Sequence, residues 1–107
     1  PKYAQANHEP RVIIEGPLAL LVSAGDRIRI NGKVSDPDGN VVTTRWIQLP
    51  VGSYQKKIVL TRPESERTEV LVPKDAVSGQ TIHLVLEATD TGSPALTRYQ
   101  RIIITIR

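Results

Sequence analysis

Apolar and polar residues alternate along most of this 107-residue chain. From Arg27 to Val34, isoleucine, glycine and valine fall on one face, and arginine, asparagine and lysine fall on the other. The same period of two recurs at 81–88 and at 96–106. This spacing is typical of half-buried β-strands, in which neighbouring side chains point to opposite faces. No segment shows the sustained three-to-four-residue period of an amphipathic helix.

Turn residues separate the alternating segments at intervals of roughly 8–12 residues, which favours an immunoglobulin-like sandwich. We therefore predict an all-β, immunoglobulin-like β-sandwich of about seven or eight antiparallel strands. Gly16-Pro17 interrupts the first strand, as expected of an edge strand that changes sheets. Residues 1–10 are polar with a proline at each end, so we assign 1–10 to a linker or interdomain arm and 11–107 to the domain. The predicted strands cover 11–15, 18–22, 27–34, 41–49, 54–61, 68–72, 81–88 and 96–106.

The turn at 35–40 fixes the phase of the strand that follows it. Its sequence, Ser-Asp-Pro-Asp-Gly-Asn, combines residues that favour chain reversal and tolerate positive φ. In the next strand, Trp46 is in phase with Val42 and Thr44, which predicts that the indole is buried in the core. The same phase places Ile47 on the outer face of the sheet.

Composition limits the chemistry that the chain can perform. It has no Cys, Phe or Met, so its core must be aliphatic and it has neither disulfides nor thiolate sites. The formal charge of +3 is spread over scattered Lys and Arg, which does not favour a nucleic-acid partner, and no apolar run is long enough to span a membrane. His8 and His83 are far apart and no serine has a GxSxG context, so we predict that the chain is not an enzyme.

The acidic turn is a candidate calcium site. Asp36, Asp38 and Asn40 alternate in the turn, and Asp90 ends a strand that could reach the same end of the sandwich. Calcium prefers several hard oxygen ligands of this kind. The alternative is that these side chains only cap backbone N–H groups in the turns.

The outer face of three strands is a candidate interface. If the strands at 41–49, 81–88 and 96–106 are neighbours in one sheet, their outward residues form an apolar centre with a polar rim, which is the anatomy of a protein interface. The alternative is that the strand at 54–61 or the N-terminal arm covers this face. The centre is formed by Ile47, Leu49, Val85, Tyr99 and Ile103, and the rim by Arg45, His83, Glu87 and Arg101.

Carbohydrate binding by ring stacking has few candidate residues. Tyr54 and Tyr99 are the candidates for a sugar contact, besides Tyr3 and Trp46, which is predicted to be in the core. A flat platform for crystalline cellulose needs several aromatic rings in a row, and these rings are far apart in the sequence. The composition therefore argues against such a platform.

Several segments resemble known modules. The turn 35–40, the pair Arg45-Trp46 and the segment 86–90 resemble immunoglobulin-like, PKD-like and cadherin-like modules of bacterial exported proteins. The segments 48–54 and 82–99 are similar to the C-terminal domain of a bacterial family described as cellulose-binding proteins. The resemblance covers about residues 8–107, but it departs from the family where Ile47 replaces an expected second tryptophan.

In that family a nucleoside-hydrolase-like domain precedes the immunoglobulin-like one. The resemblance thus implies a non-catalytic accessory module of a larger exported bacterial protein, secreted or periplasmic, that docks or positions this upstream domain. The opening residue, Pro1, agrees with a piece of a longer protein. Two alternatives remain open, a module that binds cellulose or another plant polysaccharide and a calcium-stabilised spacer. No cofactor other than this possible calcium is expected.

Overall fold

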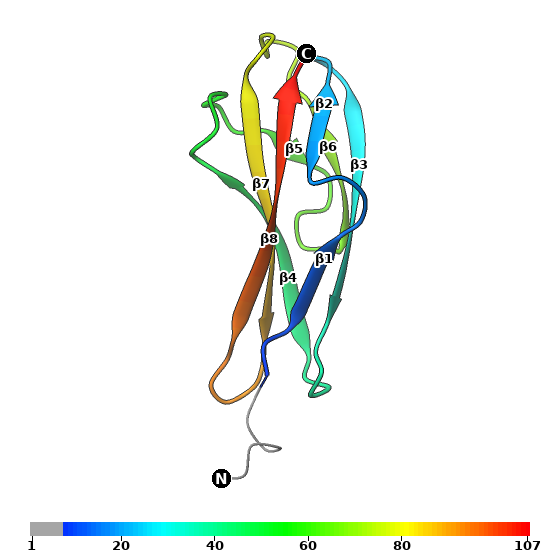
Figure 1. Cartoon of the computed structure of the whole chain (residues 1–107), viewed down its shortest axis with the longest axis vertical. Helices are drawn as coiled ribbons and strands as arrows, with labels where there is room; N and C mark the ends of the chain where they lie inside the picture. The colour runs from blue at the N-terminus through cyan, green and yellow to red at the C-terminus, as the bar shows by residue number, and fades with distance from the viewer. Residues whose placement is uncertain (1–7) are drawn as a thin grey trace.

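The computed structural model describes residues 8–107, which form eight strands in two facing sheets (Figure 1). The first sheet has the order β1-β3-β6-β5 and the second the order β2-β8-β7-β4. The predicted all-β, immunoglobulin-like sandwich is therefore confirmed. The strands are β1 Arg11–Ile14, β2 Ala19–Val22, β3 Arg27–Ser35, β4 Val42–Leu49, β5 Val59–Leu60, β6 Arg67–Leu71, β7 Thr81–Asp90 and β8 Thr97–Ile106.

The break at Gly16-Pro17 moves the chain from one sheet to the other, as the sequence predicted. Before the break β1 pairs antiparallel with β3, and after it β2 pairs with β8. The β2–β8 pairing is parallel, so the expectation that all strands are antiparallel was wrong at this one edge of the second sheet. A two-residue interruption redirects the strand without reversing it, because a reversal needs a full turn.

The core lies between the sheets and follows the alternation in the sequence. Ile82, Leu84 and Leu86 of β7 have no exposed surface, and Ile102 and Ile104 of β8 are at most 1% exposed. Trp46 is 2% exposed, and its Nε1 donates a hydrogen bond of 2.8 Å to the carbonyl oxygen of Ser65. The predicted core position of the indole is confirmed.

The predicted strand at 54–61 is mostly irregular, since only Val59–Leu60 pairs with β6. The side chain of Gln48 replaces the missing ladder. Its Nε2 donates to the carbonyl oxygen of Lys56 at 2.9 Å, and its Oε1 accepts from the N–H of Ile58 at 2.8 Å. Because the segment crosses from the β4 sheet to the β6 sheet, it cannot pair along its length with either. Further along, residues 73–79 form hydrogen-bonded turns.

The loop between β5 and β6 covers the free edge of β4. The N–H of Trp46 donates to the carbonyl oxygen of Pro63 at 2.6 Å, and Thr44 Oγ1 donates to that of Glu64 at 3.0 Å. An exposed strand edge invites pairing with other chains, so this cover protects the sheet from edge-to-edge association. Within residues 8–107 no helix could span a bilayer.

Candidate functional site

The β3–β4 turn and the β7–β8 hairpin lie at the end of the sandwich where β1 begins (Figure 1). In the turn, the Oδ1 atom of Asp36 accepts the N–H of Asp38 at 2.7 Å, and its carbonyl oxygen accepts the N–H of Gly39 at 3.1 Å. Gly39 has φ +74°, which glycine adopts without strain. The Asp side chain therefore stabilises the chain reversal itself.

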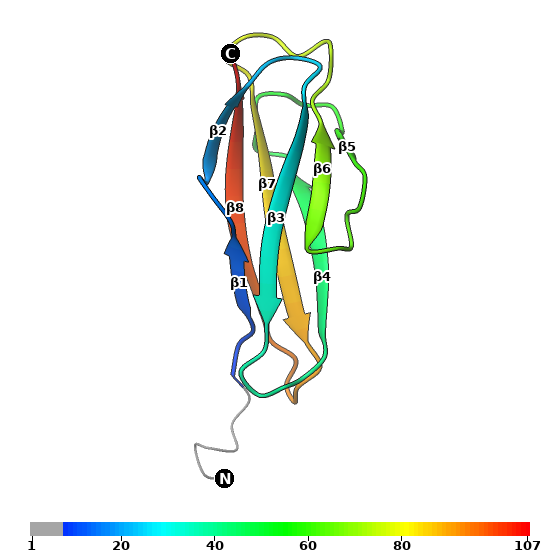
Figure 2. The ribbon, with the colours of Figure 1, turned by 90° about the vertical axis from the view of Figure 1, so that its right-hand side faces the viewer.

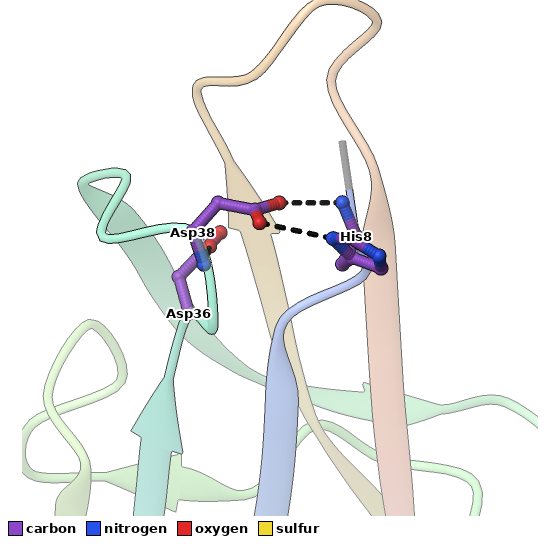
Figure 3. Close-up of polar contacts among 3 residues, drawn as sticks. All are labelled: His8, Asp36 and Asp38. Atoms are coloured by element: carbon purple, nitrogen blue, oxygen red, sulfur yellow. Dashed lines mark hydrogen bonds and ion pairs between the residues drawn. The ribbon is translucent and has the colours of Figure 1, made fainter. Parts of the chain in front are cut away.

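The carboxylate of Asp38 binds His8, which lies 30 residues earlier in the chain (Figure 3). Its Oδ2 accepts the backbone N–H of His8 at 2.6 Å, and its Oδ1 is 2.9 Å from the imidazole Nδ1. The backbone and then the side-chain hydrogen bond from His8 hold the pKa of Asp38 below its ordinary value. This contact between the arm and the turn could not be read from spacing in the sequence.

The two residues after His8 are also held by the domain. Glu9 Oε2 accepts a hydrogen bond of 2.5 Å from Arg98 Nη1, and Pro10 is fully buried. The end of the predicted arm is thus part of the folded domain. Residues 1–7, including Tyr3, lie outside the described residues.

The predicted calcium ligands make hydrogen bonds within the fold. Residues 8–107 contain no group of three or more His, Cys, Asp or Glu side chains placed to hold a metal ion. Asp90 is 3% exposed, and its Oδ1 accepts the N–H groups of Leu96 at 2.9 Å and Gly92 at 3.1 Å, closing its own hairpin. The other candidates were Asp36, which accepts the N–H of Asp38, Asp38 itself, which contacts His8, and Asn40. These carboxylates accept hydrogen bonds from backbone and arm donors, while Oδ2 of Asp36 is buried without a hydrogen-bond partner among the described residues, so calcium binding stays a prediction.

Tyr54 is a core residue and offers no ring to a sugar. It is 7% exposed, and its hydroxyl donates to Asp75 Oδ1 at 2.8 Å. Lys56 Nζ donates to Asp75 Oδ2 at 2.7 Å, so one carboxylate holds two residues at the start of this crossing. The prediction of a carbohydrate contact at Tyr54 was therefore wrong. Tyr99 is 64% exposed on the outer face of β8.

The contacts of Asp75 shift three pKa values. Hydrogen bonds from Lys56 first and from Tyr54 second lower the pKa of Asp75. The hydrogen bond to Asp75 raises the pKa of Lys56. Desolvation first, and the hydrogen bond to Asp75 second, raise the pKa of Tyr54.

We expect the two lowered carboxylate pKa values to make the domain less stable in acid. A carboxyl whose folded-state pKa is depressed stabilises the fold above its unfolded value of about 3.9, and this contribution is lost as the pH falls through the folded pKa. The variant Asp38→Asn/Asp75→Asn should show a flatter decline of the urea midpoint below about pH 5 than the parent chain. The control is Glu64→Gln, whose carboxylate has no ion pair or hydrogen bond within residues 8–107. Parallel midpoint curves for parent and double variant would refute the assignment.

The predicted apolar patch lies on the outer face of the β2-β8-β7-β4 sheet. Ile47 is opposite Val85, and His83 pairs with both Leu49 and Ile103. Tyr99 is opposite Glu87, whose Oε1 lies 3.5 Å from Nη2 of Arg45. A hollow of about 180 Å³ lies in the patch. It is lined by Ile47, Leu49, Val85, Glu87, Tyr99 and Arg101.

Within residues 8–107 the patch is partly closed: Val85 at its centre is only 4% exposed, and residues 55–58 of the predicted strand line a hollow together with Ile47 and Leu49. The short strand β5 belongs to the other sheet. The described part of the arm contacts Asp38 and Arg98.

The parallel strand β2 extends the patch beyond the predicted residues. Ala19 is opposite Ile103, and Leu21 is opposite Thr105 and 58% exposed. Sequence reasoning missed Leu21 because its exposure depends on the parallel register, although an unbroken Leu-Leu-Val run was a usable signal. It also missed that the Nδ1 atom of His83 is buried without a hydrogen-bond partner among the described residues.

Comparison with known proteins agrees with this architecture. Residues 27–106 match the family model described as "Cellulose-binding protein Sde0182, C-terminal domain". No curated protein matches the chain. A solved structure from Saccharophagus degradans, described as a nucleoside hydrolase-related hypothetical protein associated with carbohydrate metabolism, superposes with a TM-score of 0.90 at 29% identity.

The match covers 99% of this chain and 27% of the other, so the present chain corresponds to about a quarter of that protein's length. The family model covers most of the chain, from β3 to the end of β8. The expected resemblance is thereby confirmed, and the chain belongs to the family of the C-terminal domain of the cellulose-binding protein Sde0182.

Proposed function

We propose that this chain is a non-catalytic accessory module that docks onto a hydrolase-like domain and positions it. The observation that carries the proposal is the apolar patch on the outer face of β4, β7, β8 and β2, with its hollow at Val85. An apolar centre with a charged rim is the composition of surfaces that bind other proteins. Tyr99 and the neighbouring arginines are also residue types that are enriched in interfaces.

The comparison supports a hydrolase-like domain as the proposed partner. The Saccharophagus degradans protein continues well beyond the part that this chain matches, and it is described as nucleoside hydrolase-related. A domain of that kind, joined to the module in one chain, would need little affinity to stay docked, because the linkage makes the contact intramolecular. We place the whole protein outside the bacterial cytoplasm, secreted or periplasmic, on the resemblance alone.

Charging the patch should separate the two domains. In the protein that joins this module to a hydrolase-like domain, we expect Ile47→Lys/Ile103→Lys to weaken docking by about 2 kcal/mol or more, because it buries charge at the centre of an interface. Small-angle scattering should then show a larger radius of gyration, and cross-links between the domains should be lost.

The matched control is Val41→Lys/Val77→Lys, which makes the same chemical change at exposed positions away from the patch, 72% and 61% exposed. This control should keep the compact arrangement. If both variants scatter like the parent protein, the patch is not the docking surface.

A second candidate function is binding of cellulose, and the description of the family favours it. Tyr99 is the one aromatic side chain within residues 8–107 that exposes its ring. A single ring supplies one stacking contact, whereas a flat polysaccharide surface calls for several. Co-sedimentation with insoluble cellulose decides between the functions: retention that Tyr99→Ala abolishes would establish this alternative, and a chain that stays in the supernatant would remove it.

A further inference from the structure

The outward face of the β1-β3-β6 strands is cationic, in contrast to the apolar patch on the opposite sheet. The registers place Arg29 beside Glu69 and Asn31 beside Arg67, with Lys33 and Arg27 further along the same face of β3. Figure 2 shows β3 and β6 side by side along this sheet. The outward positions of these three strands hold five cations and one carboxylate: Arg11, Arg27, Arg29, Lys33 and Arg67 against Glu69.

Three arginines line one hollow on this face. Arg29, Arg62 and Arg67 line a groove of about 320 Å³, together with Asn31, Thr61, Thr68 and Glu69. The carboxylate of Glu69 is already 4.0 Å from Nε of Arg27. Within residues 8–107, the ion pairs involve none of the three groove arginines. The groove thus holds three cations and one carboxylate, and this excess of positive charge favours the binding of an anion.

The chemistry of the groove narrows the class of anion. A guanidinium group offers a planar fork of donors that matches a carboxylate in a bidentate manner. The side chains of Asn31 and Thr61 add neutral donors and acceptors of the kind that bind hydroxyl groups. Alternate residues along β3 are about 6.8 Å apart, so Arg27, Arg29 and Lys33 form a row that suits a linear chain of anionic groups.

Single-stranded nucleic acid fits this face less well than a sugar polymer. Binding of its bases relies on aromatic side chains for stacking. The outward positions of β1, β3 and β6 carry no aromatic residue. We propose that this face binds a carboxylate-bearing polysaccharide, a polyuronate, with the guanidinium groups of Arg29, Arg62 and Arg67 on the sugar carboxylates.

This site and the proposed docking patch lie on opposite sheets, so the module could hold its partner domain and the polysaccharide at the same time. The polyuronate proposal does not rest on the docking proposal, and an experiment can refute either one without refuting the other. Loss of docking would leave polyuronate binding unchanged, and loss of polyuronate binding would leave docking unchanged.

The test is binding of the 107-residue chain to polygalacturonate by titration calorimetry. Arg29→Gln/Arg67→Gln should weaken binding by roughly tenfold or more for each guanidinium removed. Arg29→Lys/Arg67→Lys keeps the charge but loses the planar fork, so it should also weaken binding. The matched control Lys57→Gln/Lys74→Gln removes two charges elsewhere and should bind like the parent chain, and thermal melts should show that all variants are folded.

Two comparison polymers sharpen the result. Fully methyl-esterified polygalacturonate has the same sugars without the carboxylate charge, and we expect it not to bind. Duplex DNA, as a second polyanion, should bind more weakly than polygalacturonate. The proposal is overturned if polygalacturonate does not bind the parent chain, or if the methyl ester or the DNA binds as tightly as polygalacturonate. It is also overturned if Lys57→Gln/Lys74→Gln loses as much affinity as Arg29→Gln/Arg67→Gln.

Discussion

Replacing Trp46 with alanine should lower the free energy of unfolding by about 3–5 kcal/mol, the usual cost of removing a large aromatic side chain from a core. The indole is 2% exposed and belongs to the main hydrophobic core cluster. Its loss leaves a cavity that the sheet cannot readily close, because the neighbouring strand β7 is held by ladder hydrogen bonds to both β4 and β8. Urea denaturation followed by circular dichroism measures the change.

Trp46→Phe separates packing from hydrogen bonding. Phenylalanine keeps most of the apolar volume but loses the donor to the carbonyl oxygen of Ser65. We expect a loss of about 1–3 kcal/mol, clearly smaller than that of the alanine variant. If Trp46→Ala costs less than about 1 kcal/mol, the indole does not hold the two sheets together in the way that its burial indicates.

Gly32→Ala should be among the most disruptive single-methyl changes in the domain. A Cβ atom on Gly32 would overlap Cδ2 of Leu86 and would lie 3.2 Å from the carbonyl oxygen of Glu66. Leu86 has no exposed surface, so its side chain cannot move away without displacing other core residues. We expect a loss of about 1–3 kcal/mol in the free energy of unfolding, measured by urea denaturation.

A double-mutant cycle tests the cause of that loss. If the clash with Leu86 is responsible, Leu86→Ala should cost less in the Gly32→Ala background than in the parent chain, because the smaller side chain gives the new methyl group room. Strictly additive losses would show that the contact with Glu66 or a backbone effect is responsible instead.

The alternation of residues was enough to predict the sheet that carries the patch. Ile47, Val85 and Ile103 lie on one outer face because each strand keeps its period of two and the three strands are neighbours in one sheet. The buried indole of Trp46 followed from the same phase. Patterns of this kind are local, so they can be interpreted without any knowledge of long-range contacts.

The features that the sequence did not reveal depend on side chains that meet across the fold. Asp38 binds a residue 30 positions away, and Tyr54 is buried because its hydroxyl reaches Asp75, 21 positions away. An acidic turn in front of a strand is compatible with a metal ion or with an N–H partner, and the sequence does not show that Asp38 contacts His8. The parallel register that exposes Leu21 is likewise set by tertiary pairing.

The two outer faces have different chemistry, although both follow from the same alternating pattern. One carries aliphatic side chains around Val85, and the other carries arginines along β3. In a sandwich the inner faces supply the stability, so the outer faces are free to differ in their partners. This separation makes the docking and polyuronate proposals independently testable.

The parallel pairing of β2 with β8 has a mechanical consequence. The strand β1 begins at one end of the sandwich and β8 ends at the other (Figure 1). Tension applied through the two ends of the domain would pull β2 and β8 in opposite directions along their common axis. The hydrogen bonds from Ala19 to Val22 would then be loaded together in shear, rather than broken one after another as in a hairpin opened from its end. A module built this way resists extension when its two ends are pulled apart.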